Sequence, residues 1–353
     1  MKLEKPRDIS LPSGVLGLSA SSDCSRLFAA CMDGQVLEVE VASGTSKPFH
    51  AKHGSFASGC VLLPDGKMLI SGGYDGCLIW HDVESRTEVR RLQAHDFWSW
   101  QIALSPDGAR VASVTGQYLP GGEKYEPAPA AEPTVKVFDA HSGDLLLALE
   151  HLPPVLSVAF SPDGQHLATA NMMGEVRVWD VKSGNHLSQF TSSDFTSWGI
   201  IKSPHYCGGI HGLSFAPDRR TLLCCGMGPM TDPMAGNGKM TWQRWDWHER
   251  KMVSQIREGE HGSGLMETLT HSPDASAFVM AGRQAQGTWN AALFSTADGK
   301  LLASLDTKSR VTRSLFSADG KTLFLAATLA QAKPDKTGKW GDHGRVHVVP
   351  ITA

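Results

Sequence analysis

Val155-Leu156-Ser157-Val158-Ala159-Phe160-Ser161-Pro162-Asp163-Gly164 joins an apolar run to a four-residue turn, and this combination decides the fold. Proline presets φ, aspartate bonds to its own backbone and glycine accepts a positive φ, so Ser-Pro-Asp-Gly predicts a tight turn. Alternating patterns then predict three more strands, over residues 166–170, 175–180 and 186–190. One unit is therefore a four-stranded antiparallel sheet, and its apolar faces need neighbouring units to cover them.

Seven copies or near copies of this turn recur along the 353 residues, with aspartates at Asp23, Asp65, Asp107, Asp163, Asp218, Asp274 and Asp319. The spacings are 42, 42, 56, 55, 56 and 45 residues, and a four-stranded propeller blade repeats about every 40–45 residues. We predict an all-β fold in which residues 1–353 form one domain, a seven-bladed β-propeller. The blades should start near residues 15, 57, 99, 155, 210, 266 and 311.

Closure of the propeller is predicted to involve the N-terminus. The last unit ends with a third strand over residues 345–349 and leaves no room for a fourth, while residues 7–11 precede the first inner strand. An open propeller would expose sheet edges that invite aggregation. We therefore expect the N-terminal strand to complete the last blade.

Composition excludes several classes of partner. The formal net charge is −3 and no run of Lys and Arg stands out, so neither nucleic acid nor a membrane surface is an expected partner. Residues 1–8 lack the apolar core of a signal peptide, and no stretch of about 18 apolar residues follows. The seven cysteines show no C-x-x-C spacing and are expected to be buried free thiols. We expect a cytoplasmic protein.

The repeat resembles the WD-repeat (WD40) β-propeller family, because Trp179-Asp180 and Trp245-Asp246 end third strands with the family's dipeptide. The chain is a divergent member, since no unit carries the full His, Ser or Thr, Asp and Trp set that rigidifies a family blade. The second unit has His81 in place of Trp, and the fourth has Met173 in place of Asp. The resemblance implies a scaffold for protein interactions, although this fold serves unrelated partners.

Four insertions lengthen the repeats, at residues 117–133, 192–209, 226–239 and 329–344. In the WD-repeat arrangement the loops that carry them emerge on one rim. Insertions collected on one side of a repeat protein mark its binding face, because variable loops stand there on a rigid scaffold.

Aromatic side chains are predicted to gather on the same rim, where Trp and Tyr combine large apolar area with a polar group. The related stretches Asp96-Phe97-Trp98-Ser99-Trp100 and Asp194-Phe195-Thr196-Ser197-Trp198 lie in two successive inter-blade loops. Two arginines that flank the seventh inner strand could bind a carboxylate. The candidate ligand-binding residues are Phe97, Trp98, Trp100, Tyr118, Tyr125, Phe195, Trp198, His205, Tyr206, Arg310, Arg313 and Trp340.

The function predicted from these residues is noncatalytic binding of a protein or peptide on the insertion-bearing face, with no cofactor and no metal. No nucleophile elbow, metalloprotease helix, phosphate loop or dinucleotide fingerprint occurs in the sequence. An alternative is a propeller enzyme or small-ligand binder with its site at the channel mouth of that face, where rim histidines and aspartates could hold a metal. A carbohydrate-binding propeller in an exported context is a third reading. It is also open that the aromatic rings only pack the insertions onto the disc.

Overall fold

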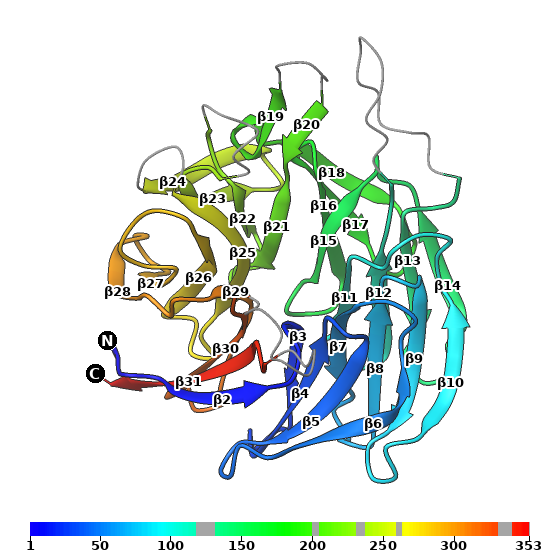
Figure 1. Cartoon of the computed structure of the whole chain (residues 1–353). Coiled ribbons are helices and arrows are strands. Elements are labelled where there is room, and N and C mark those ends of the chain that lie inside the picture. The colour runs from blue at the N-terminus through cyan, green and yellow to red at the C-terminus, as the bar shows by residue number, and fades with distance from the viewer. Residues whose placement is uncertain (118–130, 200–204, 231–236, 259–262, 331–340, 353) are drawn as a thin grey trace. The chain divides into compact units, whose positions relative to one another are not determined.

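The fold is a seven-bladed β-propeller with four-stranded antiparallel blades, as predicted (Figure 1). A computed structural model describes residues 1–117, 131–199, 205–230, 237–258, 263–330 and 341–352, with the backbone alone at 198–199 and 205–207. Two compact units are described below, Met1–Leu92 with Thr270–Arg283 and Thr288–Ala353, and Gln93–Leu269 with Gln284–Gly287. The single domain stays a prediction. In these residues no helix is long and apolar enough to cross a membrane.

The first unit contains two complete blades near the N-terminus, with strand orders β3-β4-β5-β6 and β10-β9-β8-β7. Their strands are β3 (Val15–Ala20), β4 (Arg26–Cys31), β5 (Gln35–Glu40), β6 (Ser46–Lys52), β7 (Ala57–Leu62), β8 (Met68–Gly73), β9 (Cys77–Asp82) and β10 (Glu88–Gln93).

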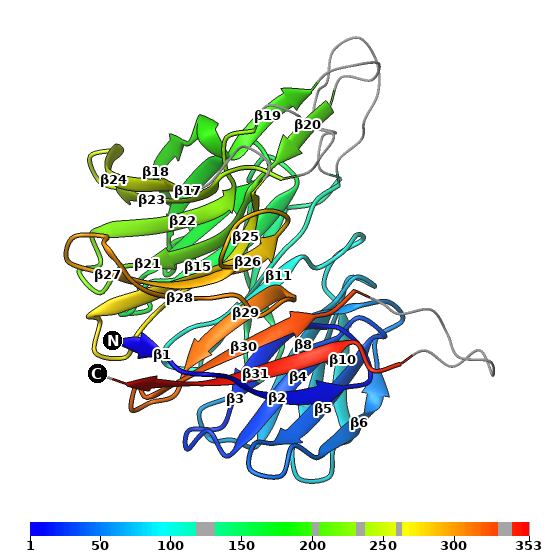
Figure 2. The same ribbon diagram turned by 60° about the vertical axis from the view of Figure 1, so that its left-hand side comes forward.

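The last blade is completed by the N-terminal strand, which confirms the prediction. The strands of this sheet are β29 (Arg310–Phe316), β30 (Thr322–Thr328), β31 (Gly344–Thr352), β2 (Arg7–Leu11) and β1 (Lys2–Leu3). Strand β2 pairs with β31 from Arg7 opposite Val348 to Leu11 opposite Gly344. Strand β1 continues the pairing, so the two termini lie side by side (Figures 1 and 2).

The second unit contains three complete blades, with orders β11-β12-β13-β14, β15-β16-β17-β18 and β21-β22-β23-β24. Their strands are β11 (Gln101–Leu104), β12 (Arg110–Val114), β13 (Val135–Asp139), β14 (Leu145–Leu149), β15 (Val155–Phe160), β16 (His166–Asn171), β17 (Glu175–Asp180), β18 (His186–Thr191), β21 (Ile210–Phe215), β22 (Thr221–Met227), β23 (Met240–Asp246) and β24 (Lys251–Glu258).

Two further sheets complete the described strands. The 3-10 turn η1 (Ser193–Phe195) leads into a two-stranded extension of β19 (Thr196–Gly199) and β20 (His205–Gly208), which stands out from the blades of the second unit (Figure 2). The remaining blade has the order β25-β26-β27-β28, with strands β25 (Gly264–His271), β26 (Ala277–Gln284), β27 (Ala291–Ser295) and β28 (Leu301–Leu305).

Burial depends on the position of a strand in its blade. The second strands are buried on both faces, and β22 is buried at every residue. The outer strands alternate instead, and in β24 every second residue is exposed. A strand packed on both faces needs an apolar residue at nearly every position, whereas a half-exposed strand needs one at every other position.

The turn that decided the fold is built as its residues predict. Ser161 Oγ donates to Asp163 Oδ1 (2.6 Å), and the backbone N–H of Gln165 donates to the same oxygen (3.1 Å). Gly164 closes the turn at φ +68°. Three near copies place a residue with a side chain in this left-handed conformation, namely Cys24, Arg219 and Ala275 at φ 56°, 58° and 62°. Their turns therefore carry a strain that glycine avoids.

The cysteines whose side chains are described are free thiols. Five of these six are buried, and Cys24 is half-buried. Burial raises the pKa of the Cys60 thiol to about 12, so this thiol stays protonated and unreactive at neutral pH.

Candidate interaction site

Three aromatic rings of the second unit stack in the loop between β10 and β11. Phe97 stacks on Trp98 with 4.9 Å between ring centroids and 11° between ring planes. Trp98 in turn meets Trp100 edge to face at 5.1 Å. Trp98 remains 38% exposed, which makes it the outermost ring of this aromatic cluster.

The backbone around the aromatic cluster is fixed by hydrogen bonds to the end of β12. Trp100 Nε1 donates to the carbonyl of Gly116 (2.9 Å), and Thr115 Oγ1 donates to the carbonyl of Trp98 (2.8 Å). Trp100 also packs against the core cluster that includes Val114. The exposed indole of Trp98 therefore stands on a support ordered before any partner arrives, and such preorganisation lowers the entropic cost of binding.

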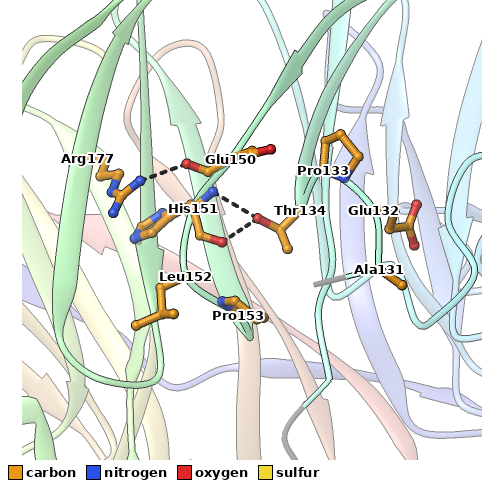
Figure 3. A pocket seen from close by; sticks show the side chains of 9 residues that line it. All are labelled: Ala131, Glu132, Pro133, Thr134, Glu150, His151, Leu152, Pro153 and Arg177. Atoms are coloured by element: carbon orange, nitrogen blue, oxygen red, sulfur yellow. Dashed lines mark hydrogen bonds between the residues drawn. The ribbon is translucent and has the colours of Figure 1, made fainter. Parts of the chain in front are cut away.

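A pocket of about 400 Å³ opens in the same unit, beside the strands β13 and β17. Its lining residues, drawn in Figure 3, are Ala131, Glu132, Pro133, Thr134, Glu150, His151, Leu152, Pro153 and Arg177. Thr134 joins two walls, because its Oγ1 donates to the carbonyl of His151 (2.6 Å) and accepts from the N–H of His151 (3.1 Å). Leu152 is 40% exposed at this pocket.

Glu132 connects one pocket wall to the aromatic loop. Its carboxylate accepts from the backbone N–H of Asp96 (2.7 Å) and from Lys136 Nζ (2.6 Å), and it lies 3.6 Å from His95 Nδ1. Burial alone would raise the pKa of Glu132, but the interactions with His95, Lys136 and the Asp96 N–H outweigh it and lower the pKa to about 2. Glu132 is therefore ionised at neutral pH.

A buried hydrogen-bond network stands behind the opposite wall. Thr169 Oγ1 accepts from Trp179 Nε1 (3.0 Å) and lies 2.9 Å from His151 Nδ1. Glu175 Oε1 lies 3.4 Å from His151 Nε2 and pairs with Arg177 Nε at 2.6 Å. Glu175 thus supplies the carboxylate that sequence reasoning missed when it found a methionine at the Asp position of this unit.

The second blade compensates for its missing tryptophan in a different way. His53 lies between Asp75 (2.9 Å) and Ser71 (2.8 Å), and His81 Nε2 lies 2.9 Å from the same Ser71 hydroxyl. The imidazole of His81 therefore occupies the bonding position expected of an indole. Burial lowers the pKa of His81 to about 3, which keeps it neutral.

Of the predicted site residues, the structure brings Phe97, Trp98 and Trp100 together. Phe195 is fully buried and belongs to a core cluster of the second unit, so its ring offers no surface to a ligand. Arg310 and Arg313 lie on β29 in the first unit, Arg310 exposed and Arg313 half-buried.

Other predicted site residues are described in part or not at all. The backbones of Trp198 and Tyr206 are directly opposite in the β19–β20 pair, with His205 opposite Gly199, but their side chains lie outside the described residues. Tyr118, Tyr125 and Trp340 also lie outside the described residues.

Sequence reasoning missed an aromatic pair in the first unit and the pocket in the second. Phe56 is 38% exposed, and its ring lies 5.6 Å from that of Tyr74. Phe56 lies between the histidine and the inner strand of its blade, and Phe97 has the same position in the next blade. This shared position could have predicted an exposed aromatic residue at Phe56. The pocket had no such signal, because its walls come from separate loops. In the described part of the chain no group of three or more His, Cys, Asp or Glu side chains could hold a metal ion.

The repeated four-stranded antiparallel blades define a β-propeller repeat protein. The family model for "WD domain, G-beta repeat" matches residues 46–82 and 133–180. These two stretches, less than half of the chain, are thus similar to the WD40 β-propeller family.

The curated relatives are distant in sequence. "WD repeat-containing protein SL1-17" of Schistosoma mansoni is 24% identical over 171 residues, 48% of this chain and 52% of the relative. "U3 small nucleolar RNA-associated protein 15 homolog" of Gallus gallus is 22% identical over 205 residues, 57% of this chain and 34% of the relative. "Actin-interacting protein 1" of Drosophila melanogaster is 25% identical over 167 residues, 45% of this chain and 24% of the relative. The chain spans about half the length of such relatives or less.

Proposed function

We propose that this protein is a noncatalytic, cytoplasmic interaction scaffold that binds a protein or peptide through the aromatic cluster of Phe97, Trp98 and Trp100. The carrying observation is that Trp98 remains 38% exposed although it stacks on Phe97 and meets edge to face the ring of Trp100, whose Nε1 donates to the carbonyl of Gly116. Large aromatic side chains on a rigid support are the residues that dominate binding energy at protein interfaces. An indole held in this way offers binding area at little entropic cost.

The family and its relatives support protein partners in general. Two relatives are named as U3 small nucleolar RNA-associated proteins, so a partner within a ribonucleoprotein is compatible with the proposal. The proposal itself is that the cluster contacts protein and not nucleic acid or membrane. The face with the insertions at 117–133 and 192–209 is the proposed binding face.

The test compares wild-type protein with the variant Trp98→Ala in capture experiments from a native lysate, followed by affinity measurement on each purified partner. We expect Trp98→Ala to weaken binding by about 30-fold or more, the effect of losing an interface residue worth about 2 kcal/mol. Leu145→Ala is the matched control, because Leu145 is 53% exposed on the outer strand β14 of the same unit.

Equal capture by wild-type and Trp98→Ala protein would contradict the proposal. Thermal unfolding of both variants checks that the fold is retained. If no partner depends on Trp98, the alternative of a small-ligand or catalytic site at the channel mouth, near Arg310 and Arg313, becomes the working hypothesis. Substrate or metabolite screening would then replace capture.

A further inference from the structure

Two contacts link the segments that carry the aromatic cluster to the pocket of about 400 Å³. The Asp96 N–H, at the start of the aromatic loop, donates to Glu132 on a pocket wall (2.7 Å). At the end of this loop, Trp100 Nε1 donates to the carbonyl of Gly116 (2.9 Å). Gly116 adjoins the pocket residue Pro153 so closely that an added Cβ would lie 2.5 Å from Pro153 Cβ. The aromatic loop is therefore linked to residues on both sides of the pocket.

Among the described residues, the two cations at this surface are already paired. Lys136 Nζ lies 2.6 Å from the Glu132 carboxylate and also donates to the carbonyl of Ala94 (2.7 Å). Arg177 pairs with Glu175 through Nε at 2.6 Å, and its Nη1 donates to the carbonyl of Glu150 (2.7 Å). Neither cation is available to attract an acidic partner.

The carboxylates outnumber these cations. Asp96 and Glu150 are exposed and have no ion-pair partner among the described residues. The Glu150 side chain points away from Arg177 (Figure 3). Burial lowers the pKa of both His95 and His151, so these histidines add no positive charge at neutral pH. In the described part of this surface, four carboxylates thus face two cations.

We propose that the partner segment bound here carries a lysine or arginine close to an apolar side chain, with the basic group held beside Glu150 at the pocket and the apolar group packed on Trp98. This proposal rests on the proposed function and specifies the chemistry of its partner. Charge complementarity selects the basic residue, because an acidic segment would meet two unpaired carboxylates. The exposed Leu152 and the neighbouring Pro153 suit the apolar stem of a long basic side chain.

The test uses a positional-scanning library of synthetic hexapeptides on immobilised wild-type protein. We expect the retained peptides to be enriched in Lys or Arg next to an aromatic or aliphatic residue. For the tightest peptide, Glu150→Gln should weaken binding by up to about 5-fold, the upper end of the range for one exposed charge contact. Glu150→Lys should abolish the preference for basic residues. Glu84→Gln, at an exposed glutamate of the first unit, should leave binding unchanged.

The outcomes separate this inference from the proposed function. If the peptides need Trp98 but show no basic enrichment, or are indifferent to Glu150→Gln, the inference is wrong and the proposed function stands. Enrichment of Asp or Glu would also overturn it. Peptide binding that ignores Trp98→Ala would overturn both. If wild-type protein retains no peptide, this inference fails, while the lysate capture still tests the proposed function.

Discussion

Replacing Thr169 with valine removes one hydroxyl on which two buried side chains depend. Thr169 Oγ1 accepts from Trp179 Nε1 at 3.0 Å and lies 2.9 Å from His151 Nδ1. The exposed fractions of Thr169, Trp179 and His151 are 0%, 5% and 3%. Valine fills the same space but cannot bond, so both nitrogens lose this partner. Each unsatisfied buried polar group costs about 1–3 kcal/mol, so we expect Thr169→Val to lower the free energy of unfolding by about 2–6 kcal/mol.

Urea titration measures this loss, and hydrogen exchange localises it. A destabilisation of about 2 kcal/mol should accelerate exchange of the amides in β16 and β17 roughly 30-fold. Thr191→Val is the control, because Thr191 is exposed at the end of β18 in the same blade. A loss below about 1 kcal/mol, or an equal loss in Thr191→Val, would refute the reasoning that the hydroxyl satisfies both side chains.

Three further changes test the turns, a buried histidine and the closure of the last blade. Gly66→Ala should destabilise the protein by about 1 kcal/mol in urea titration, because Gly66 has φ +70° although there is open space around an added Cβ. Ala275→Gly should stabilise it by up to about 1 kcal/mol, because glycine removes the strain of the left-handed backbone there. Burial lowers the pKa of His81 from 6.5 to about 3, so the folded chain binds its proton less readily than the unfolded chain. The contribution of His81 to the free energy of unfolding is therefore complete above pH 6.5 and is lost as the pH falls toward 3. We expect His81→Gln to reduce the dependence of the urea midpoint on pH across this window. Ile9→Ala should cost about 2–4 kcal/mol in the same titration, because Ile9 is 2% exposed in the strand that completes the last blade.

Each of these changes has a result that would count against it. Stabilisation by Gly66→Ala would show that the left-handed backbone is not the source of strain. An unchanged pH slope in His81→Gln would assign the acid sensitivity to other groups. If Ile9→Ala cost no more than Val89→Ala, at a 55% exposed position on β10, strand β2 would not be holding the blade closed.

The fold could be predicted because its signals are local and repeated. The turn at Ser161 to Gly164 depends on the side chains of four adjacent residues, and period-two alternation marks the strands beside it. The pairing of β2 with β31 also followed from the pattern, since the last unit lacked a fourth strand. The substitutes in the blade networks were harder to predict. Glu175 and His81 take over missing positions through contacts that only the folded blades create.

The candidate site shows where sequence reasoning stops. Asp96-Phe97 and Asp194-Phe195 look alike as sequence, yet Phe97 stacks beside the exposed Trp98 while Phe195 is buried in a core cluster with Phe190 and Ile210. Repeat number, strand pattern and blade closure were set by the sequence alone, because turns and alternation are properties of neighbouring residues. Exposure of a ring, and the pocket formed by separate loops, were decided by tertiary structure, because burial depends on which distant residues pack against a side chain.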